Sequence, residues 1–541
     1  MQSKRDQVQA HLFLMSRLTS GMLRANPDQL EAPGRRTNRG MVFGTIVAAL
    51  AVVVALLWGV FSPGTPSTWR KEGTLVMEED TGNRYIYAQG RLRSILNYSS
   101  ARLLMGPNSS TANLASSAIG DVPRGPAVGI PGAPDSLPGP DRLVTSPWQM
   151  CAASSQKTSG EADVHTRLAI GATHRGRPLG GGEALLVQGP DGRQSLVWSG
   201  QRFLLDDTSG ARASLGYGSA VAHPVSAAYL AALPAGPDIA APSVTGRGSA
   251  GPELDGTPTR IGQVFELRVP GSPAQFQLLL QDGLVPLDTM QTALVLGDPR
   301  TRDKAYAGTA PLARPIGADT ARSHQAPTAS RPSAEALPPS PPRLADIPAG
   351  TQPCIVVRPS TGKGIAVSVA LVPAAVPADY VTQPPTDHVA AACLPVDRVE
   401  IRPGRGAVVQ ALSSAGTEMG DTRYLVTDSG VRYPIASEDT LTALGYTPAD
   451  VRGVPAALLM TLPTGATLDP GAAALSPPDG GDQPSGTCPG VDGTDGSGGS
   501  GNGAGKATSA RATSAPGTAT QGSSAQVTRV KAASLRAGSP R

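Results

Sequence analysis

The sequence predicts a membrane-anchored, β-rich α+β protein. Three observations predict this class: one long apolar segment, four related strand–turn–strand–helix segments after it, and a composition rich in turn formers. Glycine and proline account for 64 and 52 of the 541 residues, and aromatic residues for only 4%. Few bulky side chains therefore remain for a large core. In chain order we expect a short cytoplasmic helix, one transmembrane helix, an extracytoplasmic domain of four quasi-symmetric repeats around a central β domain, and a disordered C-terminal tail.

The leader, residues 1–40, contains an apolar stripe with helical spacing. Its members recur three or four residues apart and so share one face of a helix: Val8, Leu12, Met15, Leu18 and Met22. Two interpretations of this amphipathic helix stay open. It rests on the membrane surface, or it docks onto a cytoplasmic partner.

The segment 41–61, MVFGTIVAALAVVVALLWGVF, carries no charged residue. As a helix rising about 1.5 Å per residue, it crosses a hydrocarbon core of roughly 30 Å. A secretory signal peptide is the alternative, but its apolar run is shorter and lies closer to the N-terminus. Trp58 and Phe61 also suit a membrane interface. We therefore predict a single-pass anchor in the cell membrane.

Flanking charge predicts the orientation of this anchor. Basic residues outnumber acidic ones in the leader, whereas only Arg70 and Lys71 follow shortly after the span. The positive-inside rule then places the N-terminus in the cytoplasm and the rest of the chain outside. The net charge of +4 is small for this length, so charge predicts no nucleic-acid partner.

Small residues recur along one side of the predicted span. They are spaced so that another helix can approach closely in lipid: Gly40, Gly44, Ala48, Ala51, Ala55 and Gly59. Glycine and alanine are also common in such helices without any partner. We favour a helix-packing face.

Four segments after the span share one plan: 84–106, 195–216, 276–297 and 423–445. Each reads as a strand, a glycine-containing turn, a strand and a short helix. The turns centre on Gly90, Gly200, Gly283 and Gly430, where glycine adopts a positive φ at little cost. The expected helix caps are Ser99, Asp207, Asp288 and Ser437, and the expected ends are Gly106, Gly216, Gly297 and Gly445.

The second and fourth segments correspond further. Each is followed at the same offsets by a similar stretch, 225–236 and 454–465. Because one such unit cannot bury its apolar face alone, we expect the repeats to pack in an approximate four-fold or two-fold arrangement. The predicted boundaries are the leader (1–40), the transmembrane helix (41–61), repeat 1 (62–135), the first half of the central domain (136–180), repeat 2 (181–245), repeat 3 (258–310), a Pro/Ala-rich linker (311–350), the second half of the central domain (351–405), repeat 4 (406–475) and the disordered tail (476–541).

All four cysteines, Cys151, Cys354, Cys393 and Cys488, follow the predicted span. An even number in an oxidising compartment predicts disulfides, and four cysteines allow three pairings. No CxxC pair or Cys/His cluster indicates zinc.

These features together resemble the EccB family of type VII (ESX) secretion systems of actinobacteria. The resemblance begins in the leader at 4–24, KRDQVQAHLFLMSRLTSGMLR, and is most specific at 128–135, VGIPGAPD, followed by Trp148 and Cys151. It extends to about Ala474.

The resemblance implies a structural subunit that forms the periplasmic part of an ESX membrane complex and supports export of WXG100-type substrates. The implied partners are membrane subunits of the EccC, EccD and EccE families and other EccB copies. It also implies a disulfide between Cys151 and Cys354, whose loop of about 200 residues would contribute roughly 5 kcal/mol in the entropic model. Cys393 and Cys488 are hypothesised to form a second bridge.

Family members are sometimes described as ATPases, but the sequence contains only near misses to a P-loop. The stretch 360–364, STGKG, lacks the Ser/Thr that binds magnesium, and 500–507, SGNGAGKA, deviates at both ends. We assign no catalytic, cofactor-binding or metal-binding residue and expect no cofactor. A structural subunit is the leading interpretation, with ATPase activity and a cell-wall-binding module as alternatives.

Overall fold

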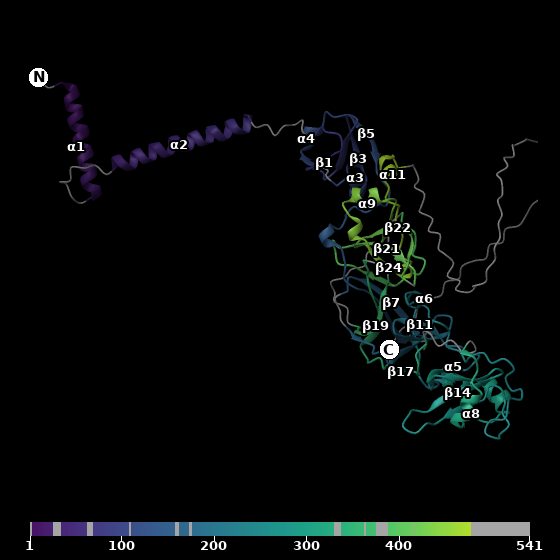
Figure 1. Ribbon diagram of the computed structural model, residues 1–541. Coiled ribbons are helices and arrows are strands. Elements are labelled where there is room, and N and C mark those ends of the chain that lie inside the picture. Colours follow the sequence, from purple (N-terminus) through teal and green to yellow (C-terminus); the bar gives the residue numbers. More distant parts are fainter. Residues whose placement is uncertain are drawn as a thin grey trace, which may run out of the picture. The chain divides into compact units, whose positions relative to one another are not determined.

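The structure is a computed structural model in which ten segments are described: 3–24, 34–61, 69–107, 110–156, 162–172, 176–328, 337–361, 364–374, 388–414 and 416–477. It confirms the predicted fold class of a mixed α+β, strand-rich chain with one N-terminal apolar helix (Figure 1). The predicted tail lies outside the described residues from 478 onward.

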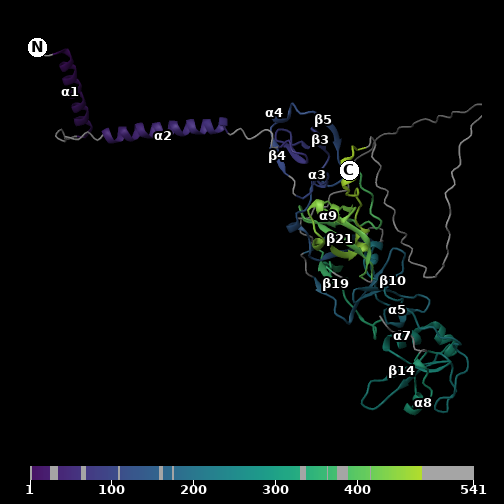
Figure 2. The same ribbon diagram turned by 45° about the horizontal axis from the view of Figure 1, so that its top comes forward.

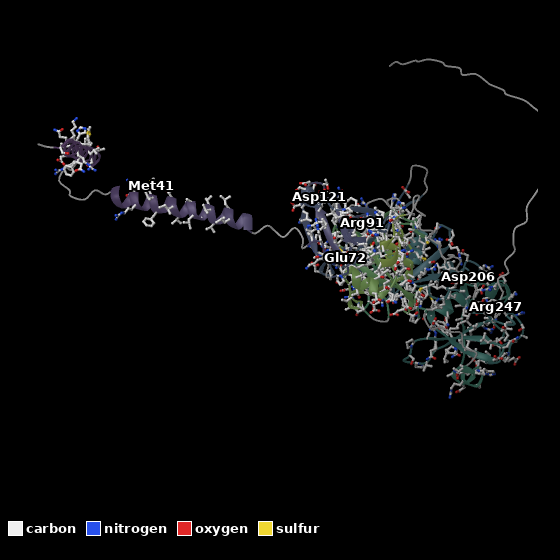
Figure 3. All side chains as sticks on the ribbon, turned by 90° about the horizontal axis from the view of Figure 1, so that it is seen from above. Met41, Glu72, Arg91, Asp121, Asp206 and Arg247 are labelled. Atoms are coloured by element: carbon white, nitrogen blue, oxygen red, sulfur yellow. A yellow bond between two sulfur atoms is a disulfide. The ribbon has the colours of Figure 1, made fainter. Side chains whose placement is uncertain are left out.

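Two helices precede the strand-rich region. Helix α1 (Lys4–Arg24) carries the apolar stripe, whose side chains are exposed. Helix α2 (Gly34–Phe61) contains a stretch, Thr37–Leu57, that is long and apolar enough to cross a membrane. No residue in that stretch is buried, and Figure 3 labels Met41 within it.

Repeat 1 defines the plan of a unit. Strands β1 (Thr74–Glu78), β2 (Arg84–Ala88) and β3 (Arg91–Ile95) form an antiparallel meander. After helix α3 (Tyr98–Met105), strand β4 (Thr111–Leu114) returns parallel to β1. After helix α4 (Ser116–Ile119), strand β5 (Arg124–Val128) runs parallel to β3. The two returning strands thus close both edges of the meander.

The other three units repeat this order. Repeat 2 contains β9 (Glu183–Gln188), β10 (Gln194–Trp198), β11 (Gln201–Leu204), α5 (Ala211–Ser214), β12 (His223–Pro224) and α6 (Ala227–Ala231). Repeat 3 contains β13 (Val264–Leu267), β14 (Gln275–Leu280), β15 (Gly283–Leu287), α7 (Thr289–Gly297), β16 (Arg314–Pro315) and α8 (Ala318–Ser323). Repeat 4 contains β21 (Ala407–Leu412), β22 (Glu418–Val426), β23 (Arg432–Ile435), α9 (Glu438–Leu444), β24 (Arg452–Pro455), α10 (Ala456–Leu459) and α11 (Pro470–Ala474). Strands β12, β16 and β24 each pair in parallel with the first strand of their unit. The last return is made by single parallel bridges, such as those from Ile239, Gln325 and Leu468.

The turn glycines behave as the sequence predicts. Gly90, Gly200, Gly283 and Gly430 all have a positive φ. Two expected helix caps are also confirmed, since the side chains of Asp288 and Ser437 accept hydrogen bonds from backbone N–H groups three residues on.

Three local predictions are wrong. Asn97, not Ser99, caps α3, because its side-chain oxygen accepts from the Ser100 N–H. Before α5, Asp206 rather than Asp207 accepts from the N–H groups of Thr208 and Ser209. Gly297 lies inside α7 rather than after it, and Asp298 follows as the C-cap.

The expected linker is partly structured. Residues 314–323, which fall in the predicted Pro/Ala-rich linker, instead form β16 and α8. They belong to repeat 3 because β16 pairs with β13 at Phe265 and Glu266. Proline and alanine content does not reveal such a short strand, since its partner lies about fifty residues earlier in the chain.

A six-stranded sheet forms the central domain. Its order is β20 (Arg398–Glu400), β7 (Ala162–Ile170), β6 (Trp148–Gln156), β18 (Thr351–Arg358), β19 (Ala366–Pro373) and β8 (Arg177–Pro178). Strands from residues 148–178 and 351–400 therefore share one sheet. A further short strand, β17 (Arg343–Leu344), pairs with β9 of repeat 2. Single turns that connect these elements are η1 (Pro140–Arg142), η2 (Thr301–Ala305) and η4 (Pro448–Asp450).

The units associate in two pairs. Helix α3 of repeat 1 contacts α9 of repeat 4, and α5 of repeat 2 contacts α7 of repeat 3, as Figures 1 and 2 show. Helices α6 and α10, which lie within the corresponding stretches 225–236 and 454–465 of repeats 2 and 4, contact each other. Both pack their apolar residues into the core of the central sheet.

Two tyrosines at equivalent positions of repeats 2 and 4 donate hydrogen bonds to backbone carbonyls outside their repeats. Tyr217 and Tyr446 each follow the glycine at the end of a repeat helix, and both are buried. The Tyr217 hydroxyl donates to the Pro342 carbonyl at 2.6 Å, and the Tyr446 hydroxyl donates to the Pro138 carbonyl at 2.7 Å. Burial raises the pKa of Tyr217 to about 12 and also raises the pKa of Tyr446. Each bond ties a repeat to the segment that leads into the central sheet.

Replacing either tyrosine by phenylalanine should destabilise the protein. Tyr217→Phe and Tyr446→Phe each leave a carbonyl oxygen without its donor, which should lower the free energy of unfolding by about 1–3 kcal/mol. Urea denaturation followed by circular dichroism measures this. Tyr87→Phe is the control, because half-buried Tyr87 packs through its ring on Trp69 at 5.6 Å. It should change stability by less than about 0.5 kcal/mol; equal losses in all three variants would contradict the assignment.

Candidate functional sites

The small-residue face of α2 is bare in the single chain. A Cβ added at Gly40 or Gly44 would meet no other atom within 4 Å. Ala48, Ala51 and Ala55 are exposed, while the surroundings of Gly59 lie outside the described region of the structure. The face therefore offers room for a second helix, and its role in packing stays a prediction.

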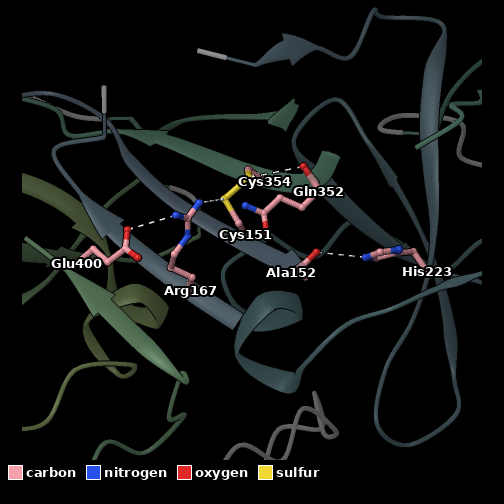
Figure 4. The surroundings of a disulfide bond; sticks show 7 residues. All are labelled: Cys151, Ala152, Arg167, His223, Gln352, Cys354 and Glu400. Carbon is pink, nitrogen blue, oxygen red and sulfur yellow. Dashed lines mark hydrogen bonds and ion pairs between the residues drawn. A yellow bond between two sulfur atoms is a disulfide. The ribbon is translucent and has the colours of Figure 1, made fainter. Parts of the chain in front are cut away.

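Cys151 and Cys354 are joined by a disulfide that lies within the central sheet. The two residues face each other on the antiparallel strands β6 and β18, with Cα atoms 4.0 Å apart (Figure 4). Both are fully buried. Cys393 is also disulfide-bonded. Its hypothesised partner, Cys488, lies outside the described residues, so that pairing stays a prediction.

A buried ion pair adjoins this disulfide. Arg167 of β7 lies beside Cys151, with its Nη2 3.8 Å from the Cys151 sulfur. Its Nη1 lies 3.3 Å from the Glu400 carboxylate on β20. The side chain of Arg167 is 11% exposed and that of Glu400 only 2%.

Sequence reasoning missed this pair. Successive side chains of a strand point to opposite faces, so Arg167 lies on the opposite face from Leu168 in the strand along 162–170. This alternation could have drawn attention to Arg167. The parallel pairing of β20 with β7, which brings Glu400 alongside, joins residues more than 200 positions apart. No local pattern indicates that contact.

An open cleft of about 1330 Å³ lies between repeat 2, the central sheet and the segment 344–347. Its described lining is mostly small and apolar, with His223, Asp346 and Gln188 among its few polar side chains. The His223 Nε2 lies 3.2 Å from the Ala152 carbonyl oxygen, and burial lowers the pKa of His223. A nucleotide site needs cations or free amides for its phosphates, and this described lining supplies no lysine or arginine.

The P-loop-like stretches gain no support from the described residues. The Ser360 N–H donates to the Gly453 carbonyl at 3.1 Å, so this amide already has a protein partner. Residues 362–363 and the second stretch, 500–507, lie outside the described segments of the chain. Within those segments, no cluster of three His, Cys, Asp or Glu residues could hold a metal ion.

Known proteins resemble this chain over most of its length. Residues 1–479 match the family model "Type VII secretion system ESX-1, transport TM domain B", which represents EccB. "ESX-2 secretion system ATPase EccB2" of Mycobacterium tuberculosis is 29% identical over 492 residues, or 88% of this chain and 95% of the relative. "ESX-5 secretion system ATPase EccB5" of the same species is 28% identical over 493 residues, or 86% of this chain and 92% of the relative.

Solved structures agree with the sequence relatives. A chain of the intact ESX-5 inner membrane complex superposes with a TM-score of 0.58 at 26% identity, covering 88% of this chain and 96% of that one. The EccB3 dimer from the ESX-3 core complex superposes with a TM-score of 0.59 at 25% identity, covering 74% of this chain and all (100%) of that one. With a family model matched from the leader to the end of repeat 4, the chain belongs to the EccB family of type VII secretion systems.

Proposed function

We propose that this chain is a structural subunit of a type VII (ESX) inner-membrane complex and forms part of its periplasmic assembly. The observation that carries the proposal is the match to a chain of the ESX-5 inner membrane complex over 88% of this chain and 96% of that one. The family model matches residues 1–479, which include the anchor as well as the repeats. The similar chain from ESX-3 forms a dimer, so we propose that this chain also associates with further copies of itself.

The architecture suits a scaffold. The central sheet, α6 and α10 share one core, and the buried tyrosine bonds tie repeats 2 and 4 to neighbouring segments. Such shared packing couples the repeats to one another and does not leave them as independent modules. We propose that the bare small-residue face of α2 contacts a membrane helix of an EccC-, EccD- or EccE-family subunit or of another copy.

The finer topology also belongs to this proposal. We place α1 in the cytoplasm, α2 across the cell membrane and residues 69–477 in the periplasm. The excess of basic residues before the span supports this orientation. The disulfide between Cys151 and Cys354 supports an oxidising location for the repeat domain.

Within this proposal the chain has no ATPase activity of its own, although relatives carry "ATPase" in their names. The cleft beside repeat 2 has a mostly apolar lining, and the Ser360 N–H donates to the Gly453 carbonyl. A periplasmic position also removes the repeats from the cytoplasmic ATP pool.

A bulky residue on the small-residue face should disrupt assembly. Ala51→Leu should reduce recovery of the other ESX membrane subunits with the tagged chain by about ten-fold, equivalent to roughly 1.4 kcal/mol of helix packing. Purification in mild detergent followed by quantitative mass spectrometry measures this. Ala49→Leu makes the same change about 160° around the helix and should have little effect. If the unaltered chain is purified without these subunits, the proposed function itself is wrong. If both variants recover the subunits equally, only the proposed packing face is wrong.

Protease accessibility tests the orientation. In intact spheroplasts, protease should degrade the repeat domain and leave an N-terminal tag protected, because the membrane shields only the cytoplasmic side. Immunoblotting for each end follows the digestion, and permeabilised cells serve as the control. Loss of the tag with survival of the repeat domain would reverse the assignment.

Hydrolysis of ATP can be tested on the purified full-length chain. Phosphate release from Mg-ATP should not exceed that of a Lys363→Ala variant, which removes the lysine of the stretch 360–364. Turnover that the variant abolishes would establish a genuine nucleotide site and contradict this aspect of the proposal.

A further inference from the structure

The two sulfurs of the buried disulfide lie in opposite electrostatic surroundings. Cys151 faces a cation, since the Arg167 Nη2 donates toward its sulfur at 3.8 Å. Cys354 faces an oxygen, since the Gln352 carbonyl lies 3.7 Å from its sulfur (Figure 4). A guanidinium favours a thiolate, whereas a carbonyl oxygen accepts a hydrogen bond only from the protonated thiol.

The sheet would keep these sulfurs together without the bond. The cysteines are the last register pair between β18 and β6, and the pairing continues from them through Ile355 with Met150 to Val357 with Trp148. On its other edge, β18 pairs with β19 over its whole length. Reduction therefore leaves both sulfurs facing each other, so the different neighbours act on the reduced pair as they lie here.

We propose that Cys151 is the exchange-active sulfur of this pair, held as the thiolate by Arg167, and that Cys354 is the resolving thiol. Its reaction partner is a disulfide oxidant, either a small molecule or a thiol–disulfide oxidoreductase. The Cys151 thiolate attacks one sulfur of the oxidant, which forms a mixed disulfide and releases one thiolate. Cys354 then gives its proton to water, and its thiolate attacks the Cys151 sulfur, which forms the internal bond and releases the second thiolate. Two electrons pass from the cysteines to the oxidant.

Glu400 opposes the effect of Arg167. Its carboxylate lies 3.3 Å from Arg167 and competes with the Cys151 thiolate for the same positive charge. Removing the charge of Arg167 should destabilise the Cys151 thiolate relative to the thiol. Removing the charge of Glu400 should stabilise that thiolate. The two substitutions therefore have opposite expected signs, which a general loss of packing would not produce.

The first experiment compares the two cysteines one at a time in the full-length, detergent-solubilised chain. Cys354→Ala leaves Cys151 and Cys151→Ala leaves Cys354, each exposed to oxidised glutathione after mild reduction. Peptide mapping locates the adduct, because Cys393 and Cys488 remain. Both sulfurs occupy one site, so any opening needed for access affects them alike. Cys151 should form the adduct at least about ten-fold faster; equal rates, or a faster Cys354, would overturn the proposal.

The second experiment keeps both cysteines and so does not depend on how those variants fold. The chain is equilibrated with mixtures of reduced and oxidised glutathione, quenched with acid and mapped. Arg167→Gln should shift the midpoint toward the disulfide by about ten-fold in equilibrium constant, and Glu400→Gln should shift it the other way. Arg177→Gln, on β8 of the same sheet but ion-paired to Glu183, is the matched control and should not shift it. Midpoints that do not move, or that move in the same direction for both variants, would contradict the assignment.

Discussion

The apolar layer between the central sheet and the helices α6 and α10 is the interaction on which the rest of the repeat domain depends. Trp148, Ile355 and Leu371 of the sheet share one buried cluster with Tyr229 of repeat 2 and Leu458 of repeat 4. Neither a short four-stranded repeat nor the sheet alone could bury these surfaces. Fully burying a side chain of this size is worth roughly 1.5–3 kcal/mol, so the layer ties three regions of the chain into one cooperative core.

This layer also explains the chain's path. The central sheet takes strands from both 148–178 and 351–400, so repeats 2 and 3 must leave and re-enter between its two halves. The disulfide between Cys151 and Cys354 lies where those halves meet and closes that 203-residue separation. The tyrosine bonds to Pro138 and Pro342 hold the segments at each crossing. Covalent and hydrogen-bonded links thus concentrate where distant segments enter one sheet.

The relation between anchor and repeat domain gives the proposed function its physical content. A lone helix with an exposed small-residue face contributes little by itself in lipid, where no hydrophobic drive brings helices together. A domain with a shared core that follows the helix in the chain can assemble copies outside the bilayer and so bring their helices together. The similarity to chains of an ESX-5 membrane complex and of an EccB3 dimer agrees with a helix that anchors and a repeat domain that assembles copies.

The sequence by itself determined the features whose physics is local. A charge-free run predicts a span, a positive φ requires glycine at Gly90 or Gly430, and a short polar side chain caps a helix at Ser437. Even there, nearby competitors decided some details, as when Asn97 rather than Ser99 caps α3. The family resemblance, carried by short motifs in order, supplied the expected disulfide pairing and the membership that the comparisons bear out.

Only the tertiary structure decided what depends on distant pairing. It placed β16 and α8 in repeat 3, brought Glu400 beside Arg167 and set the cysteines opposite one another in the central sheet. A two-residue strand is too short to show the alternation of apolar and polar residues that identifies a strand in a sequence. An ion pair between residues more than 200 positions apart leaves no local sequence pattern either. Such contacts exist because the parallel returning strands and the shared apolar layer bring the segments together, and that packing is a property of the whole chain.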